Sequence, residues 1–557
     1  MTAGTLSWLR NLRPDTLDAA ARQWLRLTAD VENAAGRAAA EVAGVLTTTV
    51  WQGADADAAA RQFDDQEAEL RIATQEAAAV AALIGRAAQE LAAAQRNGEA
   101  LLAEASAAGF QVDDNGTIRP IAAAEDPADA TRIAAALITV LDSAAMADRR
   151  FAAVLRDLAP EAVRPGLDRW ADAVDDGTAV ALLARIDARA IPSAASPDAV
   201  RAWWTGLDDG ARQRFLVGCP AVLGKLDGLP ATVRDRANRL LLHASEADLR
   251  RELRAAENAL ARAGARNGGG PALVSRIGDL RRRLAGVETL RGHLESAAHR
   301  YGPTYLLAFA PDGDYAAGGR GRGRAVIAVG NPDHARHTAV FVPGMGVGLD
   351  AAGDELGRVA DLRAAAQAKT GSPDVAAVAW IGYDTPDRLT QALDPRYAER
   401  AAPHLDRFTG GLRAAHEPGA GHLTVIGHSY GSLVVGEAAQ TGSGLHADDI
   451  VVVGSPGVHA TRATQLGTGP GHVWVGRAQG DPVPGLGAMT YASPVTGTTP
   501  TDPAFGANRF TTDGAAGHSD YWSTARPDSL ANQAAIVAGR YGDVRLVSGA
   551  PPPDGKP

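Results

Sequence analysis

The chain has 557 residues, a length that predicts two to four domains rather than a single core. Its formal net charge of −10 gives no reason to expect nucleic acid or an anionic membrane as a partner. The single cysteine, Cys219, excludes an internal disulfide framework and any cysteine-rich metal site.

The N-terminus carries no recognisable signal peptide. Its first residues lack the apolar stretch and the cleavage pattern of a secreted precursor. No run of 18 consecutive apolar residues is present, so the sequence predicts no transmembrane segment. We expect a cytoplasmic protein by default, and a leaderless export route stays open as an alternative.

Residues 14–108 are rich in alanine and predict two helices with one interruption. The first helix is expected to begin at Pro14, and Trp51-Gln52-Gly53 breaks the helical pattern. In the second helix, apolar residues from Phe63 to Leu91 recur at alternating steps of three and four, which is a heptad seam. We therefore predict a helical hairpin as the first domain, residues 1–110. Its seam must be covered by the rest of the chain, by a helical partner or by self-association.

The middle of the chain is also predicted to be mainly helical. Residues 109–120 contain Asn115-Gly116, a pair that favours a tight turn in a small hairpin. Helical patterns then continue to about residue 300, and the glycine-rich stretch Arg266–Pro271 divides a long charged helix into two arms. Residues 111–300 are therefore predicted to form a mostly helical middle region.

After residue 300 the pattern changes to short apolar runs that alternate with helical stretches. The runs have strand length, and they lie at 324–330, 337–344, 374–382, 422–428, 449–455 and 472–478. Strands that are apolar on both faces indicate a mostly parallel sheet covered by helices. The predicted fold class is therefore α/β for residues 301–545, preceded by a largely α-helical region. Residues 546–557 are predicted to be a disordered tail.

One short motif in this region carries the chemistry. Gly427-His428-Ser429-Tyr430-Gly431 has the form G-x-S-x-G, which is weak by itself in a chain with 62 glycines. However, an apolar strand runs directly into the motif and a helical stretch follows it, as a nucleophile elbow requires. Ser429 is therefore the predicted nucleophile, and the flanking glycines would permit the strained turn that holds it.

The acid and the base are predicted from their order after Ser429. Asp481 follows an apolar strand, and His518 is the only histidine beyond it. Taken singly, Asp481 is explained equally well as a turn residue and His518 as a loop residue. In the order serine, acid, histidine they predict a triad in which His518 takes the Ser429 proton and Asp481 orients the imidazole. This chemistry requires no metal and no cofactor.

Two backbone groups are assigned to the oxyanion hole. A glycine-rich loop follows the strand at 337–342, and its backbone N–H at Met345 is a candidate donor, open to a register shift of one residue. The second candidate donor is the N–H of Tyr430, directly after the nucleophile.

Aromatic residues near the predicted triad are candidates for the substrate pocket. They are Trp380, Tyr383, Tyr521 and Trp522. Core packing explains Trp380 at least as well as a role in the pocket. The long turn-rich loop 484–509, between the acid and the histidine, is a candidate flap over the site.

These segments together resemble a poorly characterised α/β-hydrolase domain family of high-GC Gram-positive bacteria. The segments that carry the resemblance read VFVPGMG, AWIGYDTP, GHSYGSLVVG, GDPV and HSDYW. The resemblance covers about 200–545, and it implies the α/β-hydrolase fold and a Ser-Asp-His triad without implying a substrate. The N-terminal hairpin around Trp51-Gln52-Gly53 resembles WXG-type helical hairpins, which are linked to type VII secretion.

The sequence supports two kinds of function. In the first, the protein is a serine hydrolase that cleaves a small or lipid-like carboxylic ester, or a related acyl substrate, through an acyl-enzyme. In the second, it is a type VII secretion-associated interaction protein or a secreted effector. The helical hairpin would then bind a partner, and hydrolysis would be secondary or absent.

Overall fold

The computed structural model describes most of the chain. The described residues are 4–46, 54–121, 127–157, 188–264, 270–312, 322–392, 394–417, 421–485 and 499–547. Trp51-Gln52-Gly53 and residues 486–498 of the candidate flap lie outside them, as does the tail from residue 548 onward. The predictions made for these segments are therefore untested.

The chain divides into two compact units. The first unit comprises residues 1–39, 61–188 and 208–219, and the second comprises residues 40–60, 189–207 and 220–557. This division differs from the predicted borders, because the helices just before residue 300 belong to the same unit as the strands after it.

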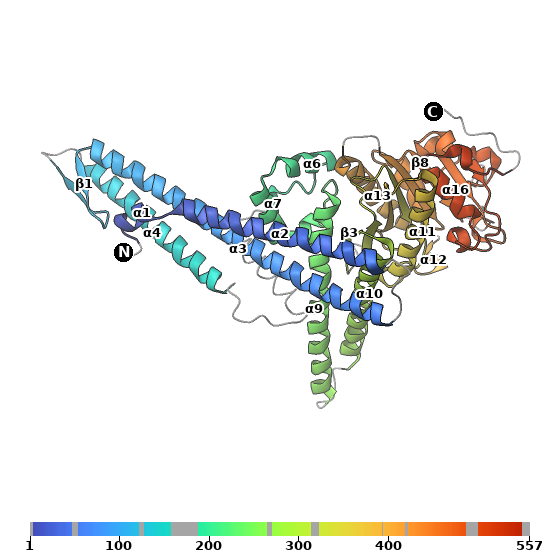
Figure 1. Ribbon diagram of the computed structural model, residues 1–557, viewed down its shortest axis with the longest axis horizontal. Coiled ribbons are helices and arrows are strands. Elements are labelled where there is room, and N and C mark those ends of the chain that lie inside the picture. Colours follow the sequence, from blue (N-terminus) through green and yellow to red (C-terminus); the bar gives the residue numbers. More distant parts are fainter. Residues whose placement is uncertain are drawn as a thin grey trace. The chain divides into compact units, whose positions relative to one another are not determined.

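The described part of the first unit is mainly helical, and three of its helices are long (Figure 1). Its described helices are α1 (Leu6–Asn11), most of α2 (Pro14–Leu46) and α3 (Ala54–Ala107), α4 (Pro127–Asp157) and α7 (Asp209–Gly218). A long helix, α2, begins at Pro14 as predicted, but it is not the first helix, because the short helix α1 precedes it. Between α3 and α4, the strands β1 (Phe110–Val112) and β2 (Ile118–Pro120) pair in antiparallel fashion, which confirms the predicted small hairpin.

The core of this unit lies between α1, α3 and α4. Leu9 of α1, Leu91 of α3 and Ile133 of α4 are buried in one apolar cluster. Gly98 lets α1 approach α3, because a Cβ at that position would lie 2.6 Å from Leu9 Cδ2. The end of the heptad seam at Leu91 is therefore covered by the chain itself, whereas Leu70, nearer its start, is exposed.

Two helical segments of this unit are long and apolar enough to cross a membrane, judged by length and composition alone. They are Leu70–Ala107 and Ala128–Arg156, and part of each is buried inside the protein. Core helices of globular proteins also meet this criterion, so the finding is weak. Neither segment contains 18 consecutive apolar residues, because single charged residues interrupt the apolar runs. The mean hydropathy over 18 residues tolerates such interruptions, so the two criteria differ.

The second unit contains an eight-stranded sheet in the order β10-β9-β8-β7-β5-β6-β4-β3. Its strands are β3 (Thr304–Ala310), β4 (Arg324–Val329), β5 (His337–Val342), β6 (Val375–Ile381), β7 (His422–His428), β8 (Asp449–Val453), β9 (Val473–Gly476) and β10 (Asn508–Phe510). All neighbours from β6 to β10 are parallel, whereas β4 runs antiparallel to both β6 and β3. The predicted α/β class is confirmed, although β3 and β10 are not among the strands that the sequence predicts.

Helices cover both faces of this sheet. One face packs against α9 (Ala231–Gly264), α10 (Gly270–Tyr301), α11 (Ala352–Thr370) and α16 (Asp528–Val537). The other packs against α13 (Arg396–Ala415) and α14 (Gly431–Gln440). Successive residues of β5 alternate between the two cores: Phe341 belongs to the first and Val342 to the second. Both faces are therefore apolar, which explains why the strands read as continuous apolar runs.

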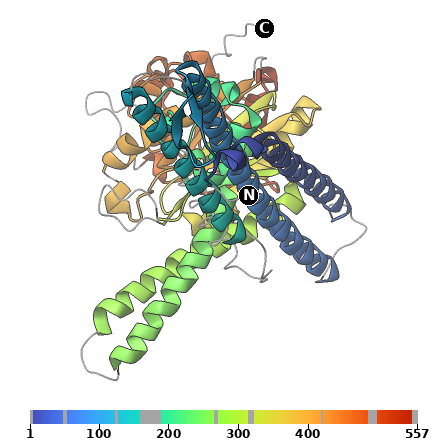
Figure 2. The same ribbon diagram turned by 90° about the vertical axis from the view of Figure 1, so that its left-hand side faces the viewer.

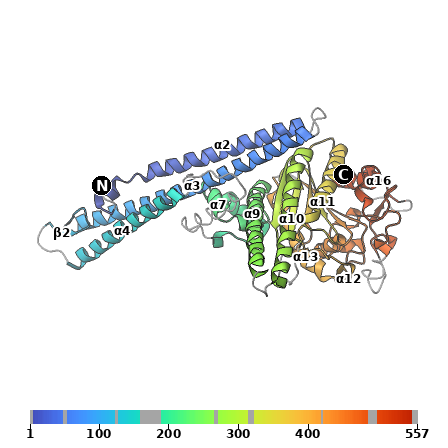
Figure 3. The same ribbon diagram turned by 90° about the horizontal axis from the view of Figure 1, so that it is seen from below.

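The helices α9 (Ala231–Gly264) and α10 (Gly270–Tyr301) form a long pair (Figures 1 and 2). Figure 3 shows α10 beside α11, in agreement with their contacts. Leu242 of α9 and Leu290 of α10 are buried in the same cluster as Phe309 of β3. These two helices therefore complete the core of the α/β sheet.

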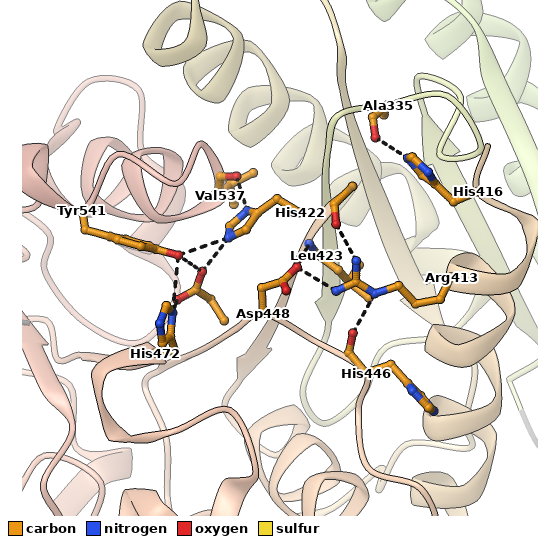
Figure 4. A network of polar contacts seen from close by, with 12 residues as sticks. Ala335, Arg413, His416, His422, Leu423, His446, Asp448, His472, Val537 and Tyr541 are labelled. Atoms are coloured by element: carbon orange, nitrogen blue, oxygen red, sulfur yellow. Dashed lines mark hydrogen bonds and ion pairs between the residues drawn. The ribbon is translucent and has the colours of Figure 1, made fainter. Parts of the chain in front are cut away.

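A buried polar network lies at the amino-terminal ends of β7 and β8 (Figure 4). His422 Nε2 lies 2.8 Å from Asp449 Oδ2, and His422 Nδ1 lies 3.0 Å from the carbonyl oxygen of Val537. Tyr541 also donates to Asp449 Oδ2, at 2.8 Å. Burial lowers the pKa of His422, but the hydrogen bond and the charge of Asp449 outweigh burial and raise it above its ordinary value. The network ties α16 and the turn at Tyr541 to the sheet.

Candidate active site

Ser429 occupies a strained turn between β7 and α14. Its φ angle is +54°, in the left-handed region that non-glycine residues rarely adopt. Its carbonyl oxygen accepts hydrogen bonds from the backbone N–H of Ser432 at 3.1 Å and from the Ser432 hydroxyl at 2.6 Å. Such a conformation costs about 1–3 kcal/mol and persists only where surrounding contacts hold it. The turn presents the Ser429 side chain at the carboxyl end of β7.

Three glycines make room for this turn. A Cβ on Gly427 would lie 2.7 Å from Ser432 Cα, and one on Gly431 would lie 2.2 Å from the carbonyl oxygen of Val342. Both separations are shorter than real Cβ contacts, which accounts for glycine at each end of the motif. Gly344 in the loop after β5 approaches the nucleophile itself, because its Cβ would lie 2.7 Å from Ser429 Cβ.

The structure brings Ser429, Asp481 and His518 into hydrogen-bond contact. His518 Nε2 lies 2.8 Å from Ser429 Oγ, and His518 Nδ1 lies 3.0 and 3.1 Å from the two carboxylate oxygens of Asp481. The three residues follow β7, β9 and β10, whose carboxyl ends share one edge of the sheet. Since an ionised carboxylate only accepts hydrogen bonds, Nδ1 carries the proton and Nε2 accepts from the Ser429 hydroxyl.

Asp481 is held ionised by its surroundings. It is 2% exposed, and it also accepts from the Tyr521 hydroxyl at 2.6 Å and from the backbone N–H of Val483 at 3.0 Å. Burial raises the pKa of Asp481, but the hydrogen bonds from His518 and Tyr521 outweigh burial and keep it below its ordinary value. The carboxylate can therefore stabilise a positive charge on the imidazole of His518.

His428 positions the imidazole of His518 from the other side. Its Nε2 donates to the carbonyl oxygen of His518 at 2.8 Å, and the centroids of the two rings are 4.7 Å apart. Burial and, to a smaller extent, the electrostatic interaction with His518 lower the pKa of His428 to about 3. His428 is therefore neutral at physiological pH, and with a pKa this low it is a poor base for the Ser429 hydroxyl.

Gly454 is a member of the site that the sequence analysis does not identify. Its φ angle is +57°, and a Cβ there would lie 3.0 Å from Asp481 Oδ2 and 3.1 Å from His518 Cε1. The signal available in the sequence is a glycine directly after β8. In the sequence, Gly454 looks like any other glycine that ends a strand. Its approach to Asp481 and His518 is therefore apparent only from the structure.

The two predicted oxyanion donors lie on the loops that adjoin Ser429. Met345 follows Gly344, whose main chain lies against the nucleophile, and its side chain is 40% exposed. Tyr430 follows Ser429 directly, and its buried hydroxyl donates to the carbonyl oxygen of Asp394 at 2.8 Å. Both loops are thus fixed close to the Ser429 hydroxyl.

The structure places the four aromatic pocket candidates in the core. Trp380, Tyr383, Tyr521 and Trp522 are each at most 5% exposed. The Tyr383 hydroxyl donates to the carbonyl oxygen of Pro343 at 2.7 Å, and the Trp522 ring packs edge-on against His428, with centroids 5.1 Å apart. Together with the bond from Tyr521 to Asp481, these contacts support the loops of the site.

Comparisons with known proteins agree with the C-terminal fold. Residues 318–490 match the family model described as alpha/beta hydrolase. The uncharacterized protein Rv2079 of Mycobacterium tuberculosis is 32% identical over 398 residues, which cover 64% of this chain and 58% of the relative. The uncharacterized protein Mb0988c of Mycobacterium bovis is 37% identical over 157 residues, covering 27% of this chain and 58% of the relative.

The alignments thus span about 58% of the length of these relatives. The family match falls on the strands β4 to β9, and it includes both Ser429 and Asp481. The sheet order, the helices on both faces and this match show that the C-terminal part of the chain contains an α/β-hydrolase domain, a family that supports hydrolase activity.

Proposed function

We propose that the protein is a serine hydrolase that cleaves a carboxylic ester or a related acyl substrate. The observation that carries the proposal is the contact of Ser429 Oγ with His518 Nε2 at 2.8 Å, in a turn where Ser429 has a positive φ. Nucleophilic catalysis has a recognisable geometry: the nucleophile is hydrogen-bonded to a base, and a third group orients that base. The α/β-hydrolase domain supports the same class of reaction.

The acylation step follows from this geometry. Ser429 Oγ attacks the carbonyl carbon of the substrate while His518 Nε2 accepts the hydroxyl proton. The buried Asp481 carboxylate, 3.0 Å from Nδ1, stabilises the imidazolium that forms. The imidazolium then protonates the departing alcohol, which leaves an acyl group on Ser429. A water molecule, deprotonated by His518, releases the acid and restores the serine.

The negatively charged oxygen of the tetrahedral intermediate must be stabilised by hydrogen-bond donors. The backbone N–H groups of Met345 and Tyr430 are our assignment, because the main chain at Gly344 and the turn after Ser429 flank the nucleophile. The loss of one such donor typically costs about 3 kcal/mol of transition-state stabilisation. The bond from Tyr383 to Pro343 fixes the first of these loops before substrate arrives.

A fluorophosphonate probe tests the assignment of the nucleophile. The wild-type protein is expected to be labelled covalently, and Ser429→Ala is expected to lose both labelling and hydrolysis of p-nitrophenyl esters. Ser443→Ala, at an exposed serine, is the matched control and should behave as wild type. Equal labelling of Ser429→Ala and wild type would refute the proposal. An ester panel of increasing acyl length would then define the substrate.

The secretion-associated alternative stays a prediction. It depends on Trp51-Gln52-Gly53, which lie outside the described residues. Binding of a partner through the N-terminal helices, and the compartment in which the protein acts, are compatible with the proposed hydrolase.

A further inference from the structure

A second concave site lies at the same edge of the sheet as Ser429 but outside the triad. It is a cavity of about 380 Å³ beside the carboxyl end of β6, the start of β4 and the end of β3. A volume of this size accommodates a small organic molecule. At ordinary strand spacing, β6 is about 10 Å from β7, which carries Ser429. None of the three triad residues lines the cavity.

The cavity has a cationic rim. Lys225, Arg234, Arg324 and Arg407 line it, and Asp227 is the single carboxylate among its described lining residues. The chain as a whole is acidic, with a formal net charge of −10. A cluster of cations in a concave site with low-dielectric walls focuses a positive potential, which attracts anions.

The single carboxylate is already engaged by two of these cations. Asp227 Oδ1 lies 2.9 Å from Arg234 Nη1, and Asp227 Oδ2 lies 3.7 Å from Arg407 Nε. By contrast, no acidic group pairs with the exposed Lys225 ammonium in the part of the chain that the structure describes. An anion in the cavity would therefore meet the positive charge of Lys225, which Asp227 does not neutralise.

The walls of the cavity are apolar and fixed. Trp380 and Phe408 line it, and both are buried in the core that α13 forms with the sheet. Arg234 is 4% exposed, donates from Nε to the carbonyl oxygen of Leu307 at 2.7 Å, and lies over the Phe408 ring at 5.6 Å. The site is therefore formed before a ligand binds, which reduces the ordering cost of binding.

We propose that this cavity binds a small organic anion, in which an apolar body carries a phosphate or carboxylate group. The apolar body would pack against Trp380 and Phe408. The anionic group would lie between Lys225 and Arg324, since guanidinium and ammonium groups bind both kinds of oxyanion. In sheets of this type, ligands bind outside the carboxyl ends of the parallel strands, which is where the cavity lies.

Calorimetric titration with phenyl phosphate and with benzoate tests the proposal, and benzyl alcohol serves as the neutral analogue. At low ionic strength, at least one anion is expected to bind at least tenfold more tightly than benzyl alcohol. The double variant Lys225→Gln/Arg324→Gln is expected to weaken that binding at least tenfold. Lys369→Gln is the matched control, because Lys369 lies at the end of α11 and does not line the cavity.

Two further measurements separate this site from the triad. The Ser429→Ala variant is expected to bind the anion as wild type does, since Ser429 does not line the cavity. Inorganic phosphate is expected to bind more weakly than phenyl phosphate, because it lacks the apolar body. Anion binding that survives in the double variant, or that disappears in Ser429→Ala, would overturn the proposal. Failure of the proposed hydrolase activity would not affect either result.

Discussion

Gly344→Ala is a sharp test of the oxyanion loop, because it adds one methyl group beside the nucleophile. The new Cβ would lie 2.7 Å from Ser429 Cβ, 3.1 Å from Ser429 Oγ and 3.2 Å from the carbonyl oxygen of His428. The first contact is shorter than Cβ atoms in real proteins show. Either the loop after β5 or the Ser429 turn must therefore move.

The size of the effect follows from the movement required. Ordinary contact between carbon atoms begins near 3.5 Å, so the two groups must separate by roughly 0.8 Å. A misplacement of about 1 Å in a catalytic constellation can reduce the rate about 100-fold. A 100-fold decrease corresponds to about 2.7 kcal/mol of transition-state stabilisation. The loss should appear in kcat, since the loop carries Met345, whose backbone N–H is the proposed donor to the transition state.

Steady-state hydrolysis of p-nitrophenyl acetate and the rate of fluorophosphonate labelling measure this loss. Gly357→Ala is the matched control, because no heavy atom lies within 4 Å of a Cβ built at Gly357, within α11. That variant should retain full activity, with a gain in stability of about 0.4–1 kcal/mol. A folded Gly344→Ala protein that kept kcat within twofold of wild type would show that this loop does not form the oxyanion hole.

Three further substitutions test the supporting contacts. His428→Phe should lower kcat about tenfold by removing the donor to the His518 carbonyl. Because the pKa of His428 is about 3, the acidic limb of the pH–rate profile between pH 4.5 and 9 should remain in this variant. The disappearance of that limb would identify His428 as the base. Tyr521→Phe should lower the free energy of unfolding in urea by about 1–3 kcal/mol, since it removes a buried donor to the Asp481 carboxylate, whereas an unchanged value would mean that this bond adds nothing. The raised pKa of His422 contributes stability that is fully present below the ordinary histidine pKa of 6.5 and is lost as the pH rises through the pKa in the folded protein. The wild-type protein should therefore lose more stability than His422→Gln between pH 6 and 9. Parallel curves of stability against pH for the two proteins would contradict this.

The three side chains proposed as the triad were accessible to sequence reasoning because each has a distinct position in the chain. Ser429 is marked by glycines at a fixed spacing, Asp481 by the strand before it, and His518 by being the last histidine. The structure places His518 between the other two, with Nε2 2.8 Å from Ser429 Oγ and Nδ1 3.0 Å from Asp481 Oδ1. Chain order was informative because parallel strands of one sheet end at the same edge.

The strands that the sequence does not predict have a common reason. β10 has only three residues, Asn508–Phe510, and β3 begins directly after the helix α10 and pairs only at the edge of the sheet. Three residues are too few for periodicity to identify β10, and the apolar run of β3 follows α10 so closely that its pattern does not distinguish a strand from the end of a buried helix. Likewise, the assignment of α9 and α10 to the sheet depends on contacts such as that of Leu290 with the core around Phe309, which no local pattern encodes.

His428 shows how far the supporting residues could be predicted. Its place beside Ser429 favours a packing or hydrogen-bonding residue over a second base, but the sequence does not identify its partners. Its role depends on two contacts made by distant parts of the chain: its Nε2 donates to the carbonyl oxygen of His518, and its ring packs against Trp522. Both contacts bury the imidazole and favour its neutral form. An exposed histidine has a pKa near 6.5, so it is the burial of His428 rather than its residue type that keeps it neutral and leaves it a positioning group.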